Sequence, residues 1–197
     1  MNRTAVRTLA AATALAATAV ALPSASATGT PATPASGSVA VTASNAFLTS
    51  ALQSGIAAVP LPTATGSYNS GTGATVTFPV TGGSASLPNF YGTITLGGGL
   101  AFADALTGKF ICFHQVSFSG ENQELSAVPD GGTTPVNLFF FGDNTVGSGA
   151  GVTPQTLTGD ADIPADGAAY LDSALHTSFF TANQVVGSLS VSFTPAH

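Results

Sequence analysis

The side chains with the widest chemical repertoire in this sequence are Cys112 and His114, which stand two positions apart. Residues two apart on a β-strand point the same way, so a thiolate and an imidazole in this arrangement can share a metal ion. A structural zinc site takes about four such ligands, and the sequence has no second pair and only one cysteine. We therefore interpret Cys112 as a buried apolar side chain and His114 as a structural histidine. Metal ligation by His114 is the alternative.

Three aspartates, Asp160, Asp162 and Asp166, form the densest group of carboxylates. Hard cations such as Ca²⁺ bind clustered carboxylates, but an EF-hand loop has a different spacing and a distal glutamate. Alternation places Asp160 and Asp162 on the exposed face of a strand, and Asp166 falls near the start of a helix, where the dipole favours negative charge. We interpret all three as surface and capping residues, with calcium binding as the alternative.

Strong catalytic motifs are missing from the sequence. The segment GSGAG at 147–151 lacks the spacing of the Gly-x-Ser-x-Gly nucleophile elbow. Glu121 and Glu124 form a carboxylate pair three positions apart, but a sequence without tryptophan lacks the aromatic platform of a typical glycosidase. We predict that the protein is not an enzyme, and a secreted hydrolase is the least favoured alternative.

The N-terminus has the pattern of a secretory signal. Two arginines precede an apolar run at 9–22, and the motif Ala25-x-Ala27 is suited to signal peptidase. The run is short for a membrane span, so we predict cleavage after residue 27 and no membrane insertion afterwards. The expected product is a secreted, extracellular protein.

The mature chain is expected to hold one domain behind a tether. Residues 28–38 are rich in Thr, Pro, Ser and Gly, which predicts a flexible linker, and residues 39–197 have the length of a single domain. This part of the chain has one base, Lys109, and nine acidic residues, which gives a net charge of about −8. Nucleic acid and anionic membranes are disfavoured as partners because no basic patch can form.

The longest stretch of alternating strand-forming residues runs from Gly108 to Gly120 and predicts a central strand. The face expected to be the more apolar one comprises Phe110, Cys112, His114, Val116 and Phe118. Further strands are predicted at 39–42, 74–80, 84–87, 90–96, 100–103, 123–128, 135–141, 156–163 and 185–194, and short helices at 45–54 and 165–175. Short strands separated by Gly and Pro turns predict a mainly β fold, either a β-sandwich or a flattened barrel, with two short helices near the chain ends.

These elements contain the segments FPVTGG at 78–83, GTITL at 92–96, GGLAF at 98–102, LTG at 157–159, AAYL at 168–171 and VGSL at 186–189. In this order the segments resemble the HtaA-like secreted domains of actinobacteria. The resemblance implies a β fold and covers nearly the whole mature chain.

The resemblance also implies a ligand. Better-studied members of that family bind haem, with a tyrosine of the N-terminal segment ligating the iron and a nearby histidine supporting it. This sequence has Phe47 in the N-terminal helix and glycines at 97–99 in place of those residues. Tyr68 and His114 are therefore the candidate ligands if haem is bound.

Two functions follow from these observations. The leading hypothesis is a secreted, non-catalytic module with a surface, structural or ligand-binding role, whose partner is a small molecule or a cell-surface component and which needs no cofactor. The alternative is a haem-binding protein in iron acquisition.

Overall fold

The computed structural model describes residues 33–143 and 145–197. The predicted signal peptide, residues 1–27, and the start of the predicted tether lie outside this part of the chain. The first strand begins at Ser36, a little before the predicted domain boundary at residue 39. It does so because Ser36–Ser38 continue the pairing with the last strand, opposite Thr194–Ser192.

The strands are β1 (Ser36–Ala43), β2 (Ile56–Leu61), β3 (Thr65–Asn69), β4 (Gly73–Ser86), β5 (Tyr91–Leu96), β6 (Gly99–Asp104), β7 (Lys109–Ser119), β8 (Glu124–Pro129), β9 (Val136–Phe141), β10 (Val146–Ser148), β11 (Gln155–Ile163) and β12 (Gln184–Thr194). The helices are α1 (Asn45–Gln53) and α2 (Ala165–Leu175), with one 3₁₀ turn, η1 (Leu87–Asn89). Both helices were expected at these positions, whereas β2, β3 and β10 are not among the strands predicted from the sequence.

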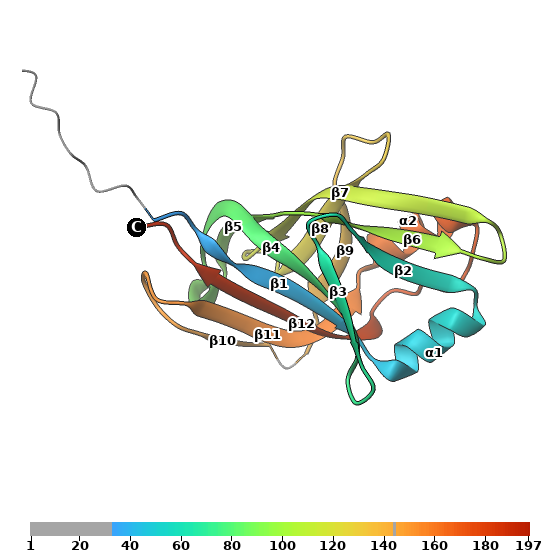
Figure 1. Cartoon of the computed structure of the whole chain (residues 1–197), viewed down its shortest axis with the longest axis horizontal. Helices are drawn as coiled ribbons and strands as arrows, with labels where there is room; N and C mark the ends of the chain where they lie inside the picture. The colour runs from blue at the N-terminus through green and yellow to red at the C-terminus, as the bar shows by residue number, and fades with distance from the viewer. Residues whose placement is uncertain (1–32, 144) are drawn as a thin grey trace, which may run out of the picture. The chain divides into compact units, whose positions relative to one another are not determined.

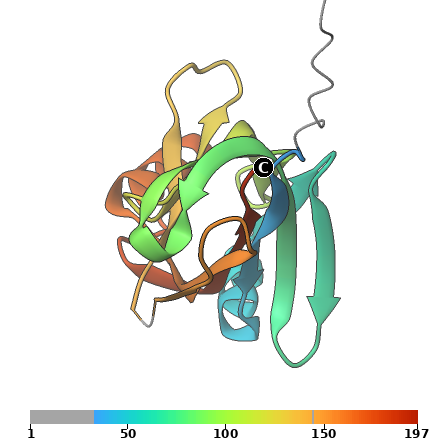
Figure 2. The same cartoon turned by 90° about the vertical axis from the view of Figure 1, so that its left-hand side faces the viewer.

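Eight of the strands close into an antiparallel barrel. The order is β7–β5–β4–β1–β12–β11–β9–β8, and β8 pairs back onto β7. Figure 1 shows the barrel from the side, with its strands running along the long axis, and Figure 2 looks along that axis. Closure satisfies the backbone hydrogen bonds of each strand from both neighbours, so the barrel form of the predicted fold class is the one adopted.

The remaining strands extend this barrel. Strand β6 pairs with the first half of β7, and β2 pairs with the outer edge of β6. Strand β3 pairs only with β4, and the resulting hairpin projects from the barrel next to α1 (Figure 2). Strand β10 pairs with β11. Strands β2 and β6, together with α1, line much of the cavity described below.

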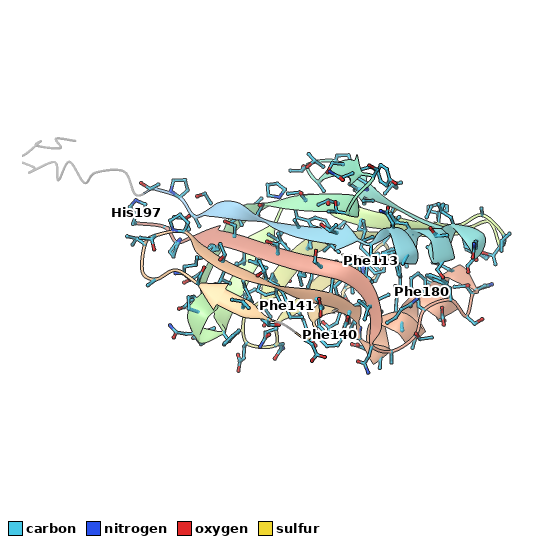
Figure 3. All side chains as sticks on the ribbon, turned by 90° about the horizontal axis from the view of Figure 1, so that it is seen from below. Phe113, Phe140, Phe141, Phe180 and His197 are labelled. Carbon is cyan, nitrogen blue, oxygen red and sulfur yellow. The ribbon has the colours of Figure 1, made fainter. Side chains whose placement is uncertain are left out.

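The barrel interior is filled by aromatic and branched side chains. The Phe118 and Phe141 rings meet edge to face with centroids 5.8 Å apart, and Phe113 contacts Tyr170 of α2 in the same way at 6.0 Å. Such contacts add to the burial free energy of the rings themselves. Leu171 and Leu175 of α2 are fully buried. Figure 3 shows Phe113, Phe141 and Phe180 along the barrel, with His197 at the end opposite Phe180.

The predicted face of β7 is wrong in its first half. Phe113 is fully buried, whereas Phe110 is 75% exposed, Cys112 is partly exposed and His114 is exposed. The cause is a β-bulge between His114 and Ser117, with Gln115 in the left-handed region at φ 51°. A bulge adds one residue to the strand, so the inward-facing positions change from odd to even numbers.

The second half of β7 agrees with the prediction. Val116 and Phe118 both point into the core and are buried.

Among the described residues, no helix has the length and hydropathy needed to cross a bilayer.

Candidate functional site

An apolar cavity of about 460 Å³ lies between α1 and the barrel. Its walls come from α1, from β2 and β6, from the ends of β1 and β12 that adjoin α1, and from the β3–β4 hairpin. Side chains distant in sequence, Phe139, Ile163 and Phe180, complete it. This volume is within the range of roughly 300 to 1,000 Å³ that is typical of small-molecule sites.

Helix α1, which forms one wall of the cavity, begins one residue after the end of β1. Ser44 directly precedes this helix and is of a residue type that caps helices, and its Oγ accepts a hydrogen bond of 3.2 Å from the backbone N–H of Phe47. The Ser44 backbone N–H donates to the Val186 carbonyl at 2.9 Å, which fixes the start of the helix against β12. The Phe47 ring packs against Phe179 with centroids 5.7 Å apart. The helix is therefore held at its N-terminal end and by an aromatic contact beside the cavity.

The lining is almost entirely apolar. Asn45, Thr49 and Tyr68 are the only lining residues with polar side chains, and no charged side chain of the described chain lines the cavity. Leu100 and Phe102 of β6 and Phe78 of β4 are buried contributors to the wall. Such a surface binds by removing apolar area from water, with polar groups serving orientation.

The polar side chains gather where α1 faces the β3–β4 hairpin. Asn45 Nδ2 donates to the Ser70 carbonyl at 2.8 Å, and Tyr68 Oη donates to Asn45 Oδ1 at 3.4 Å. The Thr49 hydroxyl donates back to the Asn45 carbonyl at 2.8 Å and is turned toward its own helix. Tyr68 is 68% exposed, so this polar group marks the mouth of the cavity.

The two residues proposed from the sequence as haem ligands lie in different places. Tyr68 lines the cavity, whereas His114 is not among the lining residues. His114 Nε2 lies 2.9 Å from Asp130 Oδ1, with the two side chains 51% and 60% exposed. His114 is thus a surface residue, and the expectation that it faces the core is wrong because of the β7 bulge.

Metal ligation finds no support in the geometry of the described residues. They contain no group of three or more His, Cys, Asp or Glu side chains arranged to hold an ion. The carboxylate of Asp166 lies in the first turn of α2, where the helix dipole favours it, but Pro164 occupies the N-cap and no side chain caps the helix. Asp166 instead accepts a hydrogen bond of 3.2 Å from Asn137 Nδ2. Asp160 and Asp162 lie on β11 on the face opposite the buried Ala161 and Ile163, but both are partly buried and not exposed as expected. One carboxylate oxygen of Asp162 is itself buried.

Comparisons with known proteins identify the architecture. No family model and no curated protein matches the sequence. Among solved structures, the C-terminal domain of HtaA from Corynebacterium glutamicum superimposes with a TM-score of 0.57 at 14% identity, over 84% of this chain and 99% of that one. The fold is HtaA-like. A domain-swapped dimer variant of the same HtaA domain gives a TM-score of 0.51 at 15% identity, over 76% of this chain and 90% of the other.

The HtaA-like fold agrees with the family resemblance seen in the sequence. Within this fold, Phe47 of α1 lines the cavity at the helix where the resemblance leads one to expect a tyrosine. Sequence reasoning selected Tyr68 but missed Asn45, because only the pairing of β3 with β4 brings the hairpin beside α1. A polar residue at the start of a helix gives no signal of such a contact in the sequence.

Proposed function

We propose that this chain is a secreted, non-catalytic binding module that holds a small apolar molecule in the cavity between α1 and the barrel. The observation that carries the proposal is the cavity itself, which has a ligand-sized volume and a lining without charge. Burying apolar surface contributes roughly 25 cal/mol per Å², so 200 Å² of buried ligand surface would contribute roughly 5 kcal/mol before the costs of association.

The lining also supports a non-catalytic role. General acid–base and nucleophilic catalysis depend on groups such as His, Asp, Glu, Cys, Lys or Ser placed at the substrate. None of these types occurs among the lining residues of the described chain. Tyr68 and Thr49, which could also act in catalysis, donate their hydroxyl hydrogens to Asn45 and have no partner acid or base in the lining. Turnover of an ester, glycoside or peptide substrate by the purified protein would favour the hydrolase alternative.

Haem is the second candidate ligand, favoured by the HtaA-like fold and by Tyr68 in the lining. A haem site needs an iron ligand, which the Tyr68 phenolate can supply, and partners for two propionate groups. The described lining offers neither a histidine nor a basic side chain, and Lys109, the sole base of the described chain, is not part of it. The lining therefore fits an uncharged apolar molecule better than haem.

The proposal is tested by binding of a neutral fluorescent dye, N-phenylnaphthylamine, to the mature chain. We expect saturable fluorescence enhancement in the micromolar range. Ala74→Phe places a ring into the cavity and should weaken binding at least tenfold, because Ala74 lies in the lining. Ala103→Phe is the matched control, since Ala103 is exposed on β6 and does not line the cavity.

Two results would contradict this assignment. Equal dye binding by the wild type and Ala74→Phe would show that the cavity is not the site. A hemin titration that produces a Soret shift at micromolar haem, lost in Tyr68→Phe and retained in His114→Ala, would replace the proposal with haem binding through Tyr68. We expect no Soret shift.

A further inference from the structure

The polar mouth of the cavity selects among apolar ligands. Resting on the function proposed above, we propose that the site takes an uncharged molecule with an apolar body and one terminal hydrogen-bonding group, such as a hydroxyl. Tyr68 and Asn45 are the specificity-determining residues for that group.

The hydrogen-bond partners of Asn45 fix how its amide is oriented. The Ser70 carbonyl can only accept, so the amide nitrogen must face it, and Nδ2 does so at 2.8 Å. The amide oxygen is then left facing the Tyr68 hydroxyl. This arrangement uses one of the two Nδ2 hydrogens and leaves the other available.

Tyr68 also retains hydrogen-bonding capacity. Its hydroxyl donates to Asn45 Oδ1 across 3.4 Å, which is beyond the usual 2.5 to 3.0 Å of an O–H···O bond. This hydrogen bond is therefore weak, and the acceptor lone pairs of the phenol oxygen are unused. A ligand hydroxyl can both donate to and accept from this pair, whereas a ligand without such a group gains neither hydrogen bond and leaves the pair to water.

The charge of the site opposes ionic ligands. No basic or acidic side chain of the described residues lines the cavity, so a carboxylate or ammonium buried there would lose its hydration without gaining a counter-ion. Anions are disfavoured further by the nine acidic residues of the chain. Both effects point to a neutral end group.

The experiment is displacement of N-phenylnaphthylamine from the mature chain by decanol, chlorodecane and decanoate at a pH of about 8, where a carboxylic acid is ionised. The three share one apolar chain and differ in the end group. We expect decanol to displace the dye at a concentration at least tenfold lower than decanoate. The affinity of each competitor is calculated with the dye affinity measured for the same protein variant.

The role of Tyr68 is isolated by comparing ligands across variants. In Tyr68→Phe the ratio of decanol to chlorodecane affinity should fall roughly three- to tenfold, the value of one hydrogen bond. Tyr91→Phe is the matched control, because Tyr91 is also 68% exposed and does not line the cavity. Its ratio should equal that of the wild type.

The outcomes separate this inference from the proposed function. Failure of the dye to bind the wild type would overturn both. Dye binding with decanoate as effective as decanol, or with a decanol-to-chlorodecane ratio unaffected by Tyr68→Phe, would leave the apolar site standing and overturn the selection by Tyr68 and Asn45.

Discussion

The carboxylate of Asp162 lies on β11 with one oxygen, Oδ1, buried and without a hydrogen-bond partner among the described residues. Burial raises the pKa of this group above the usual aspartate value, and the charges of Asp160 and Asp143 raise it further. All three effects disfavour the ionised form. The folded protein therefore holds the Asp162 proton more tightly than the unfolded chain does.

A raised pKa in the folded state determines the direction of the pH dependence. The penalty for ionising Asp162 is absent below the unfolded-state pKa of about 3.9 and is complete once the pH exceeds the raised folded-state value. Stability should therefore decline as the pH rises through this window. Glu124, whose pKa is raised by burial and by Asp166, adds to the same decline.

We expect Asp162→Asn to raise the melting temperature at pH 7 and to leave it unchanged at a pH of about 3, because the neutral amide has no ionisation penalty. Thermal unfolding followed by circular dichroism across this range measures the difference. Glu121→Gln, which removes one negative charge from an exposed position, is the control and should lack this pH-dependent gain. A lower melting temperature for Asp162→Asn at every pH would mean that the carboxylate makes a net favourable interaction.

At the scale of single elements, β7 shows how far the sequence predicts this fold. The strand itself, both helices and the cap at Ser44 follow from local patterns and are present. The inward face of β7 does not follow from local patterns, because it depends on the bulge in the pairing with β8. Gln115 is not a residue type that marks a bulge in a sequence. Cavity residues from α1, β3 and β6 likewise meet only through long-range pairing, so Tyr68 could be named in advance but its contact with Asn45 could not.

The bulge leads to a prediction about Gln115, whose φ of 51° is in the left-handed region. A β-branched side chain is strained there, so Gln115→Val should lower the free energy of unfolding by about 1 to 3 kcal/mol. Gln115→Gly adopts this conformation freely and should remain within about 1 kcal/mol of the wild type.

Urea denaturation of the three proteins provides the measurement. Phe110→Val is the control, because it introduces the same side chain at an exposed position of the same strand and should change the free energy of unfolding by less than about 0.5 kcal/mol. Equal stability of Gln115→Val and Gln115→Gly would argue against the bulge and restore the regular alternation expected from the sequence.

At the scale of the whole domain, β12 joins the two ends of the chain. It lies between β1, the first described strand, and β11, and it pairs with both over most of its length. Four apolar side chains of β12 are buried: Val186, Leu189, Val191 and Phe193. Without β12 the barrel would open, and the facing edges of β1 and β11 would lose their hydrogen-bond partners.

We expect a mature chain that ends at Asn183 to lose cooperative unfolding. Each of the four buried side chains contributes roughly 1.5 to 3 kcal/mol, and the sum of roughly 6 to 12 kcal/mol is comparable to the 5 to 15 kcal/mol stability of a typical domain. A chain that ends at Thr194 is the control, because it keeps β12 and loses only the backbone pairing of His197 with Thr33. Calorimetry should show one sharp transition for the control and none for the shorter chain. A sharp transition in the shorter chain would mean that the other strands form a stable core without closure by β12.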